Sequence, residues 1–274
     1  MKRKNIQQIL KNGDEITQTA TDIVLSFCGK RKVLSTSSLC GGIHTGLEAV
    51  FNHCDKDFET GRCEMYGNTY ADHLCYVAKS IGLNPQKVSG LSTAADLSWA
   101  SIAKEQFHEY EVTVICSGGV LHNGRRAGDA ATMWEQDDIY HIEDQETKRI
   151  SGTVNLIVHI NACLSDGAMT TALLVATEAK TATIRDRKCK SCYSEQYASG
   201  SGTDGVIVIG DMESNIKLFH ANTDVRLGEC IGKAVSNAVA EQLHLQMIYE
   251  EKYISPKSMS QEKAETFLSA YKYE

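Results

Sequence analysis

The sequence predicts an α/β protein, in which a mixed β-sheet is packed with α-helices in a single domain made of two halves of related size. Runs rich in β-branched residues alternate along the chain with segments of helical periodicity, a pattern typical of this class. Hydrophobic residues make up 42% of the 274 residues, enough to build a sizeable core. An acidic stretch at 135–148 separates the two halves, and we expect it to be a surface connection.

Each element follows from a local pattern. Strands are predicted where β-branched residues gather, at 22–25, 32–35, 111–116, 153–160 and 205–209. Helices are predicted at 69–81, 166–184 and 227–251. Gly82 ends the first of these helices. Ser258 and Gln261 have the spacing of a capping box, so a last helix is expected at 258–274, as an appendage to a main domain at 1–257.

Composition and charge narrow the class of protein. The net charge of −7 argues against general attraction to nucleic acid or to an anionic membrane. No apolar run approaches the ~20 residues of a membrane span, and the basic opening Lys2-Arg3-Lys4 leads into polar residues, unlike a secretory signal. Ten scattered cysteines fit a reducing compartment. We expect a soluble cytoplasmic protein that binds neither nucleic acid nor membrane, and the oligomeric state stays open.

The strongest local signal is a Ser-Gly-Ser-Gly-Thr-Asp turn that leads straight into a predicted strand. Gly200 and Gly202 allow the backbone to approach a ligand closely, and successive N–H groups in such a turn can form an anion-binding nest. Ser201 and Thr203 add hydroxyl donors, and Asp204 could orient a nucleophile or accept a proton. The alternative is a structural turn in which Asp204 bonds its own backbone. The turn's chemistry leaves both interpretations open.

The predicted helix at 166–184 carries a candidate general acid or base. Glu178 lies one turn after Leu174 and one turn before Ala182, so it has apolar neighbours along its own ridge. A buried carboxylate there needs a partner or a proton, which would raise its pKa and suit acid–base work. The alternative is a structural ion pair. Lys180 points in nearly the opposite direction, so the two residues are expected to have separate roles.

Two further glycine-rich turns follow predicted strands. One ends in Gly41 and Gly42, and the other is a Ser-Gly-Gly turn at 117–119, followed by Arg126 and Asp129. Exposed glycines at strand ends favour a crevice, where α/β proteins tend to bind ligands. An arginine there could bind carboxylate, amide or phosphate oxygens.

Several segments together resemble the adenosylcobinamide amidohydrolase family. They occur in the family's order, at 34–35, 41–42, 91–96, 126–129, 152–157, 161–165, 176–181, 199–204 and 227–232. The resemblance covers roughly 33–239, most of the chain. It implies hydrolysis of the amide that joins a propionate arm of the corrin ring to aminopropanol, which yields adenosylcobyric acid in cobalamin salvage. It also implies a small-molecule corrinoid substrate, whose cobalt belongs to the substrate, and no separate cofactor or protein-bound metal.

The residues suggest how such an amide would be hydrolysed. Backbone donors of the glycine-rich turn would stabilise the oxyanion, Glu178 or Asp204 would activate water, and Lys180 or Glu229 would assist charge or proton handling. One departure from the family is Asp224, which stands where a histidine is expected. If that histidine is catalytic in relatives, either Asp224 replaces it or the activity of this protein is altered. The residues expected to bind the substrate are Gly41, Gly42, Arg126, Asp129, Asn161, Gly200, Ser201, Gly202 and Thr203.

Three other interpretations stay open at this point. A cysteine hydrolase would use Cys40 or Cys116, each beside a glycine-rich turn. A zinc-dependent amidase would use Cys189 and Cys192, although no recognised second ligand pair accompanies them. The third is a non-catalytic corrinoid-binding or sensing protein, which would bind the corrinoid and return it intact.

Overall fold

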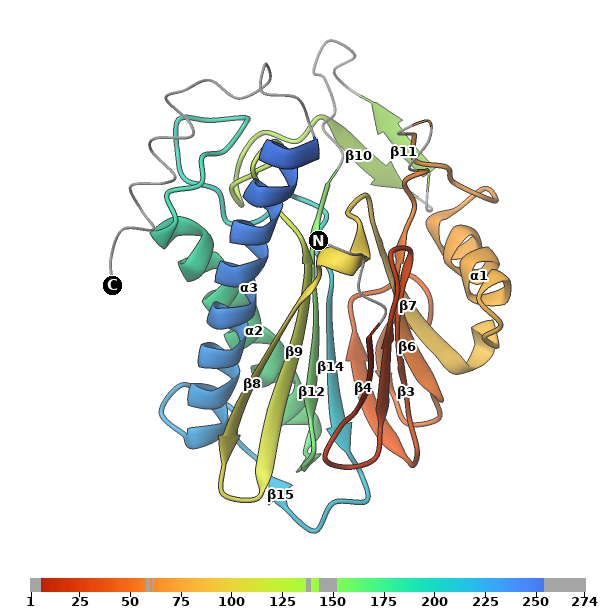
Figure 1. Ribbon diagram of the computed structural model, residues 1–274, viewed down its shortest axis with the longest axis vertical. Coiled ribbons are helices and arrows are strands. Elements are labelled where there is room, and N and C mark those ends of the chain that lie inside the picture. Colours follow the sequence, from red (N-terminus) through yellow and green to blue (C-terminus); the bar gives the residue numbers. More distant parts are fainter. Residues whose placement is uncertain (1–5, 58–59, 61, 137–138, 143–151, 254–274) are drawn as a thin grey trace.

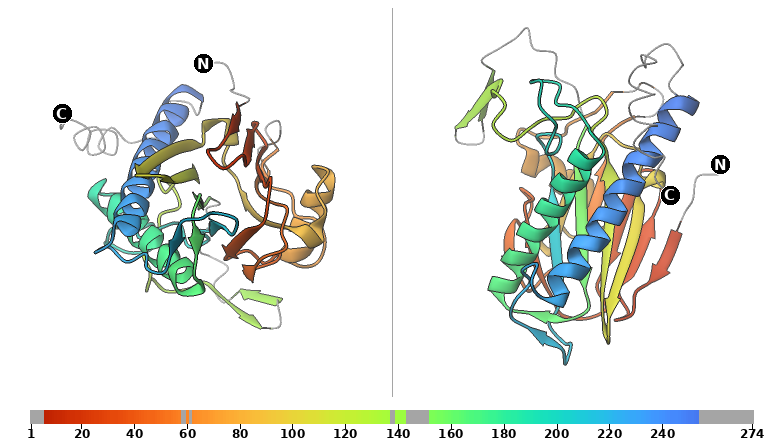
Figure 2. Two further views of the ribbon diagram at one scale, coloured as in Figure 1. Left: turned by 90° about the horizontal axis from the view of Figure 1, so that it is seen from below. Right: turned by 90° about the vertical axis from the view of Figure 1, so that its left-hand side faces the viewer.

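Two β-sheets face each other, and helices cover both outer faces, so the layers run helix, sheet, sheet, helix (Figures 1 and 2). The computed structural model describes residues 6–57, 60, 62–136, 139–142 and 152–253. The predicted α/β class is confirmed, with two main mixed sheets where the sequence suggested one. The expected helix at 258–274 lies outside the described residues.

The first sheet has five strands. Their order is β1 (Ile6–Ile9), β2 (Glu15–Gln18), β3 (Asp22–Ser26), β6 (Ala49–Cys54) and β7 (Val88–Thr93). The neighbours are antiparallel except for β6 and β7, which run parallel and are joined through α1 (Tyr70–Ser80) and the short η1 (Pro85–Lys87). The Thr69 side chain caps the start of α1 by accepting a hydrogen bond from the Asp72 N–H. Gly82 follows the end of this helix with a φ of 79°, in the role that the sequence predicted.

The second sheet has six strands and takes them from both halves of the sequence. Their order is β5 (Gly42–His44), β4 (Arg31–Ser35), β14 (Val206–Asp211), β12 (Val154–Ile160), β9 (Tyr110–Gly118) and β8 (Ser101–Phe107). The parallel strands β12 and β14 are connected by α2 (Asp166–Asp186), and α3 (Arg226–Tyr253) packs beside α2 on the same face. All five predicted strands and all three predicted helices within the described residues are therefore confirmed.

Smaller elements complete the fold. They are the hairpin of β10 (Met133–Gln136) and β11 (Ile139–Ile142), the pair β13 (Cys163–Leu164) and β15 (Lys217–Leu218), and η2 (Leu97–Trp99). The hairpin opens the acidic stretch and has exposed side chains, as a surface connection should. None of the helices in the described part of the chain is long and apolar enough to cross a membrane.

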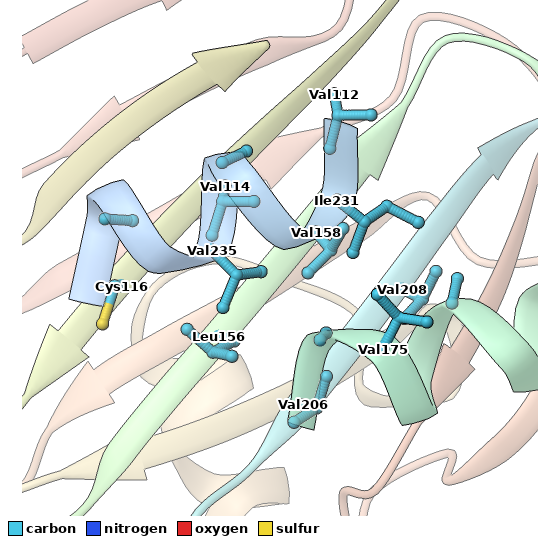
Figure 3. Packing of buried hydrophobic residues seen from close by; sticks show 14 of the residues in the cluster. Val112, Val114, Cys116, Leu156, Val158, Val175, Val206, Val208, Ile231 and Val235 are labelled. Atoms are coloured by element: carbon cyan, nitrogen blue, oxygen red, sulfur yellow. The ribbon is translucent and has the colours of Figure 1, made fainter. Parts of the chain in front are cut away.

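Three apolar clusters fill the spaces between the layers. Ile157 and Ile209 lie in the cluster between the two sheets, whereas Phe51 and Leu74 belong to the one between the five-stranded sheet and α1. The largest cluster joins the six-stranded sheet to α2 and α3, and includes Val235 (Figure 3). Because β12 is covered on both faces, all seven of its residues are buried.

A group of buried charges holds the N-terminal hairpin, formed by β1 and β2, against the second sheet. The Arg31 guanidinium donates to Asp14 at 2.7 and 2.9 Å and to Asp211 at 2.9 Å. His159 Nε2 lies 2.9 Å from Asp14 Oδ2, and Asn12 donates to Asp211 at 3.0 Å. Burial alone would raise the pKa of Asp14, but hydrogen bonds from His159 and Arg31 outweigh it and hold that pKa well below its usual range.

We predict that Arg31→Met lowers the free energy of unfolding by about 3–5 kcal/mol, because it leaves two buried carboxylates without their cation. Denaturant titration would measure this loss. Lys87→Met is the control, since Lys87 pairs with Glu48 on the surface and its loss should cost less than about 1 kcal/mol. Equal losses for the two variants would contradict the prediction.

The same cluster predicts a pH dependence of stability. A carboxylate with a lowered pKa contributes stability above its unfolded-state pKa, and this contribution is lost as pH falls. The usual value for Asp14 is 3.8, so the unfolding free energy should decline as pH drops below about 4. In Asp14→Asn this part of the slope should disappear, and an unchanged slope would show that other groups cause it.

Candidate active site

The carboxylate of Asp204 is the centre of the glycine-rich turn at 199–204. Its Oδ1 accepts hydrogen bonds from the N–H of Val154 at 2.9 Å, the N–H of Ser201 at 3.1 Å and the Ser201 hydroxyl. Its Oδ2 pairs with the Lys180 ammonium. Asp204 therefore bonds its own turn, as the structural interpretation predicted, and also pairs with a cation from α2.

The glycines of the turn are required by this arrangement. A Cβ on Gly200 would lie 2.0 Å from Asp204 Oδ2 and 3.2 Å from Lys180 Nζ, so a side chain there would displace the ion pair. Gly202 has a φ of 91°, in the region that other residues rarely adopt, and a Cβ there would meet Arg125 at 2.9 Å. The two positions hold the turn tightly against Lys180 and Arg125.

Three successive N–H groups of the turn point to no protein acceptor. Within the described residues, nothing accepts a hydrogen bond from the backbone N–H of Gly202, Thr203 or Asp204. The N–H groups on either side are used, since Ser201 donates to Asp204 and Gly205 donates to Asn155 at 3.0 Å. Gly202 and Thr203 are exposed residues, so a ligand oxygen can approach this part of the turn. The predicted donors 200–203 are thus corrected to 202–204.

Lys180 and Glu178 lie on different faces of α2. The Lys180 side chain is buried, 6% exposed, and reaches the turn, whereas Glu178 is exposed. The expectation that Glu178 is a buried acid is wrong, because Leu174, 55% exposed, and Ala182 form a solvent-facing ridge with it. The expectation of separate roles for Glu178 and Lys180 agrees with this geometry.

A buried amide network fastens the turn to both sheets. Asn155 Oδ1 accepts from the N–H of Gly205, and its Nδ2 donates to Asn52 Oδ1 at 3.0 Å and to the Ser92 carbonyl at 2.8 Å. Asn52 in turn donates to the Ser117 hydroxyl at 2.6 Å. Sequence reasoning missed Asn155, although a single amide inside the apolar run of β12 was a usable signal.

The loop around Arg126 and Asp129 lies against the turn. The Ser199 hydroxyl accepts from the N–H of Ala127 at 2.8 Å, and Arg125 exchanges backbone hydrogen bonds with 199–200. Hydrogen bonds from the Ser191 hydroxyl and from the Arg126 N–H lower the pKa of Asp129, which keeps this carboxylate charged. For the Arg126 guanidinium, the described residues offer no acceptor.

Three other predicted positions are not part of this arrangement. Gly42 pairs with Ser35 on β4, one strand further from β12 than β14, so Gly41 and Gly42 share the end of the sheet but make no hydrogen bond to the turn. Asn161 follows the far end of β12, about 23 Å from Val154 at ~3.3 Å per residue. Its amide instead accepts from the Glu111 N–H. Asn161 therefore cannot bind the same amide as the turn.

Glu229 is also remote from the turn. It lies in the first turn of α3, at the lower end of the molecule in Figure 1, whereas the turn lies at the upper end, before β14. Glu229 pairs there with Arg226 and Lys233, and hydrogen bonds from Lys233 and Arg226 lower its pKa. The expectation that Glu229 assists at the turn is wrong. Asp224 is exposed just before the same helix, so it does not supply a base there either.

The cysteines do not provide an activated thiol at this site. Burial strongly raises the pKa of Cys116, which lies under Lys180 and Asp204, and burial also raises the pKa of Cys40. Cys189 is buried with a pKa raised to about 12, while Cys192 is exposed and its thiol contacts the His122 carbonyl. Among the residues that the structure describes, no group of three or more His, Cys, Asp or Glu side chains has the arrangement of a metal site.

Comparison with known proteins defines the class to which this fold and site belong. Residues 7–251 match the family described as CbiZ, adenosylcobinamide amidohydrolase, and the chain belongs to this family. The resemblance seen in the sequence is thereby confirmed. At the level of the family, the protein is an amidohydrolase with a corrinoid substrate.

One relative and one solved structure are similar to the chain. The uncharacterized protein MJ1613 of Methanocaldococcus jannaschii is 32% identical over 235 residues, which cover 84% of this chain and 88% of the relative. The crystal structure of the PH0078 protein from Pyrococcus horikoshii OT3 aligns with a TM-score of 0.39 and 12% identity, over 87% of this chain and 82% of that one.

We predict that Lys180→Met destabilises the protein by about 3–5 kcal/mol, because it leaves the Asp204 carboxylate in a buried site without its cation. Adding Asp204→Asn should recover part of that loss, which a double-mutant cycle in denaturant would measure. Glu178→Gln on the exposed face of the same helix is the control and should change stability by less than about 0.5 kcal/mol. Strictly additive effects of the Lys180 and Asp204 substitutions would contradict a coupled pair.

Proposed function

We propose that the protein hydrolyses the aminopropanol amide of adenosylcobinamide and releases adenosylcobyric acid, as a step of cobalamin salvage. The observation that carries the proposal is the row of three N–H groups at Gly202, Thr203 and Asp204, which bond no acceptor among the described residues and adjoin the buried pair of Asp204 and Lys180. Amide hydrolysis passes through a tetrahedral oxyanion, and preorganised backbone donors are the groups that stabilise it. Family membership supplies the corrinoid as the substrate.

The surroundings of the turn support the rest of the site. The Arg126 guanidinium would hold carbonyl oxygens at the corrin periphery, and Asp129 fixes the Arg126 loop by accepting from its N–H at 2.8 Å. The Lys180 ammonium compensates the charge of Asp204, so this carboxylate does not repel an oxyanion that forms nearby. Cobalt would enter only as part of the corrinoid, and the proposal needs no separate cofactor. We place the reaction in the cytoplasm.

Incubation with adenosylcobinamide tests this function directly. Purified protein should release aminopropanol and adenosylcobyric acid in equal amounts, detected by mass spectrometry. A corrinoid-binding or sensing protein would return the substrate intact, and that outcome would overturn the proposal. Boiled protein and substrate alone are the blanks.

We predict that Gly202→Ala lowers kcat by roughly 10–100-fold, because the loss of a single oxyanion donor costs about 100–1,000-fold and this substitution displaces the donors without deleting them. The displacement follows from the strained φ of 91° and from the close approach to Arg125. Gly82→Ala is the matched control, since it has a similar φ of 79° with open space around it, at the end of α1. Steady-state kinetics should show a normal kcat for the control, and equal effects on both would contradict the assignment.

A further inference from the structure

We infer that the hydroxyl of Ser201 is the nucleophile of this hydrolysis, so that the reaction runs through an ester on the protein and water attacks only in the second half. The inference rests on the proposed function and adds to it the identity of the attacking group. It replaces the role of a water activated directly by Asp204 or Glu178.

The hydroxyls of the turn differ in what they contact. Ser199 accepts from the N–H of Ala127, and Thr203 donates to the Gly152 carbonyl at 3.1 Å. Ser201 alone among these three donates to a carboxylate, that of Asp204. A hydroxyl becomes a useful nucleophile when an adjacent base can take its proton, and nucleophile and base must be within hydrogen-bond reach. Only Ser201 meets this condition in the turn.

The base is itself oriented by a third group. Asp204 bonds Ser201 through Oδ1 and the Lys180 ammonium through Oδ2. Nucleophile, base and orienting group therefore follow one another, in the order that hydrolases with an activated hydroxyl use. The Ser201 side chain is held in one position, because Ser201 is 8% exposed and its N–H also bonds Asp204.

The free N–H groups lie where an acyl group on Ser201 would need them. In α/β-hydrolases with a nucleophilic serine, the N–H of the following residue is part of the oxyanion hole. Here the residues after Ser201 are Gly202 and Thr203, two exposed residues whose N–H groups have no acceptor in the described part of the chain. A water molecule attacking from elsewhere would not require the donors to follow a hydroxyl in the chain. Their adjacency to Ser201 favours the serine.

The steps balance without a further reactant. Ser201 Oγ bonds the amide carbon, its proton passes to Asp204, and the carbonyl oxygen becomes an oxyanion on the N–H groups of Gly202 and Thr203. The C–N bond then breaks, the proton moves from Asp204 to the nitrogen, and aminopropanol leaves. Water next adds to the ester carbon and gives a proton to Asp204. The C–Oγ bond breaks, Oγ regains the proton, and the corrinoid leaves as a carboxylate with one proton released to solvent.

Trapping the ester tests this inference on the wild-type protein. Rapid acid quench during turnover, followed by peptide mass spectrometry, should find the corrinoid acyl group on the peptide that contains Ser201. Added hydroxylamine should divert the product to a hydroxamate, because it competes with water for the ester. An acyl group on another residue would overturn the assignment to Ser201, and the absence of both adduct and hydroxamate would overturn the ester.

Substitution provides the second arm. Ser201→Ala should lower kcat at least about a thousandfold, in line with the loss of a nucleophile in other hydrolases, while corrinoid binding persists. Ser201→Cys should still form an adduct, now a thioester. Ser80→Ala is the matched control, since the Ser80 hydroxyl only bonds the Val77 carbonyl within α1. A loss of less than about tenfold in Ser201→Ala would overturn the inference.

The result for the wild type separates the two levels of the proposal. If the wild type releases no aminopropanol, the proposed function fails and the inference fails with it. If the wild type releases aminopropanol but shows neither an adduct nor a need for Ser201, the function stands and water is the nucleophile.

Discussion

The carboxylate of Asp204 is the constraint on which the rest of the site depends. A charge removed from water is expensive unless hydrogen bonds and a counter-ion compensate for it. Asp204 receives these from the N–H at the start of β12, from both donors of Ser201 and from Lys180 on α2. Because these groups come from different segments, satisfying one carboxylate fixes the turn against the sheet and the helix. In the described part of the chain, the N–H groups of Gly202 and Thr203 then have no acceptor.

The amide network extends this constraint across the sandwich. A large apolar cluster fills much of the layer between the sheets, so a buried amide beside it must use its full hydrogen-bonding capacity. Asn155 does so, with Oδ1 facing Gly205 and Nδ2 reaching Asn52 and Ser92 on the opposite sheet. Tyr70 at the start of α1 contacts the Ser92 hydroxyl at 2.8 Å, so the outer helix of the first sheet is connected to the same network. The turn is therefore positioned by both sheets.

Local sequence patterns were enough to predict the helices, the strands and the glycine-rich turn. They did not predict which distant segments lie close together in the fold. The strands β12 and β14 and the helix between them have strong periodicity, and the chemistry of the turn is contained in consecutive residues. Asn161 and Glu229 were assigned to the site because their segments follow the order of the family's motifs along the chain. In the fold, both residues lie at the opposite end of the molecule from the turn. The prediction of a buried Glu178 failed because apolar neighbours at helical spacing do not reveal which face of the helix packs on the sheet. Leu174, one of those neighbours, is exposed. The pairing of Lys180 with Asp204 joins segments 24 residues apart, which spacing rules do not address.

Two buried groups of charges have been described, and their surroundings explain why the Arg31 cluster is interpreted as structural and the pair of Lys180 and Asp204 as catalytic. In the cluster of Arg31, Asp14 and Asp211, donors and acceptors bond one another, the principal side chains are at most 9% exposed, and the arrangement fastens the N-terminal hairpin. The pair of Lys180 and Asp204 is similarly buried, yet it adjoins the exposed residues Gly202 and Thr203, whose backbone N–H groups bond no described residue. If stability were the only requirement, these N–H groups would be expected to bond acceptors within the protein, as the donors of the Arg31 cluster do. A substrate oxygen that binds these N–H groups would explain why they bond no acceptor among the described residues, although the charge of Asp204 beside them is compensated.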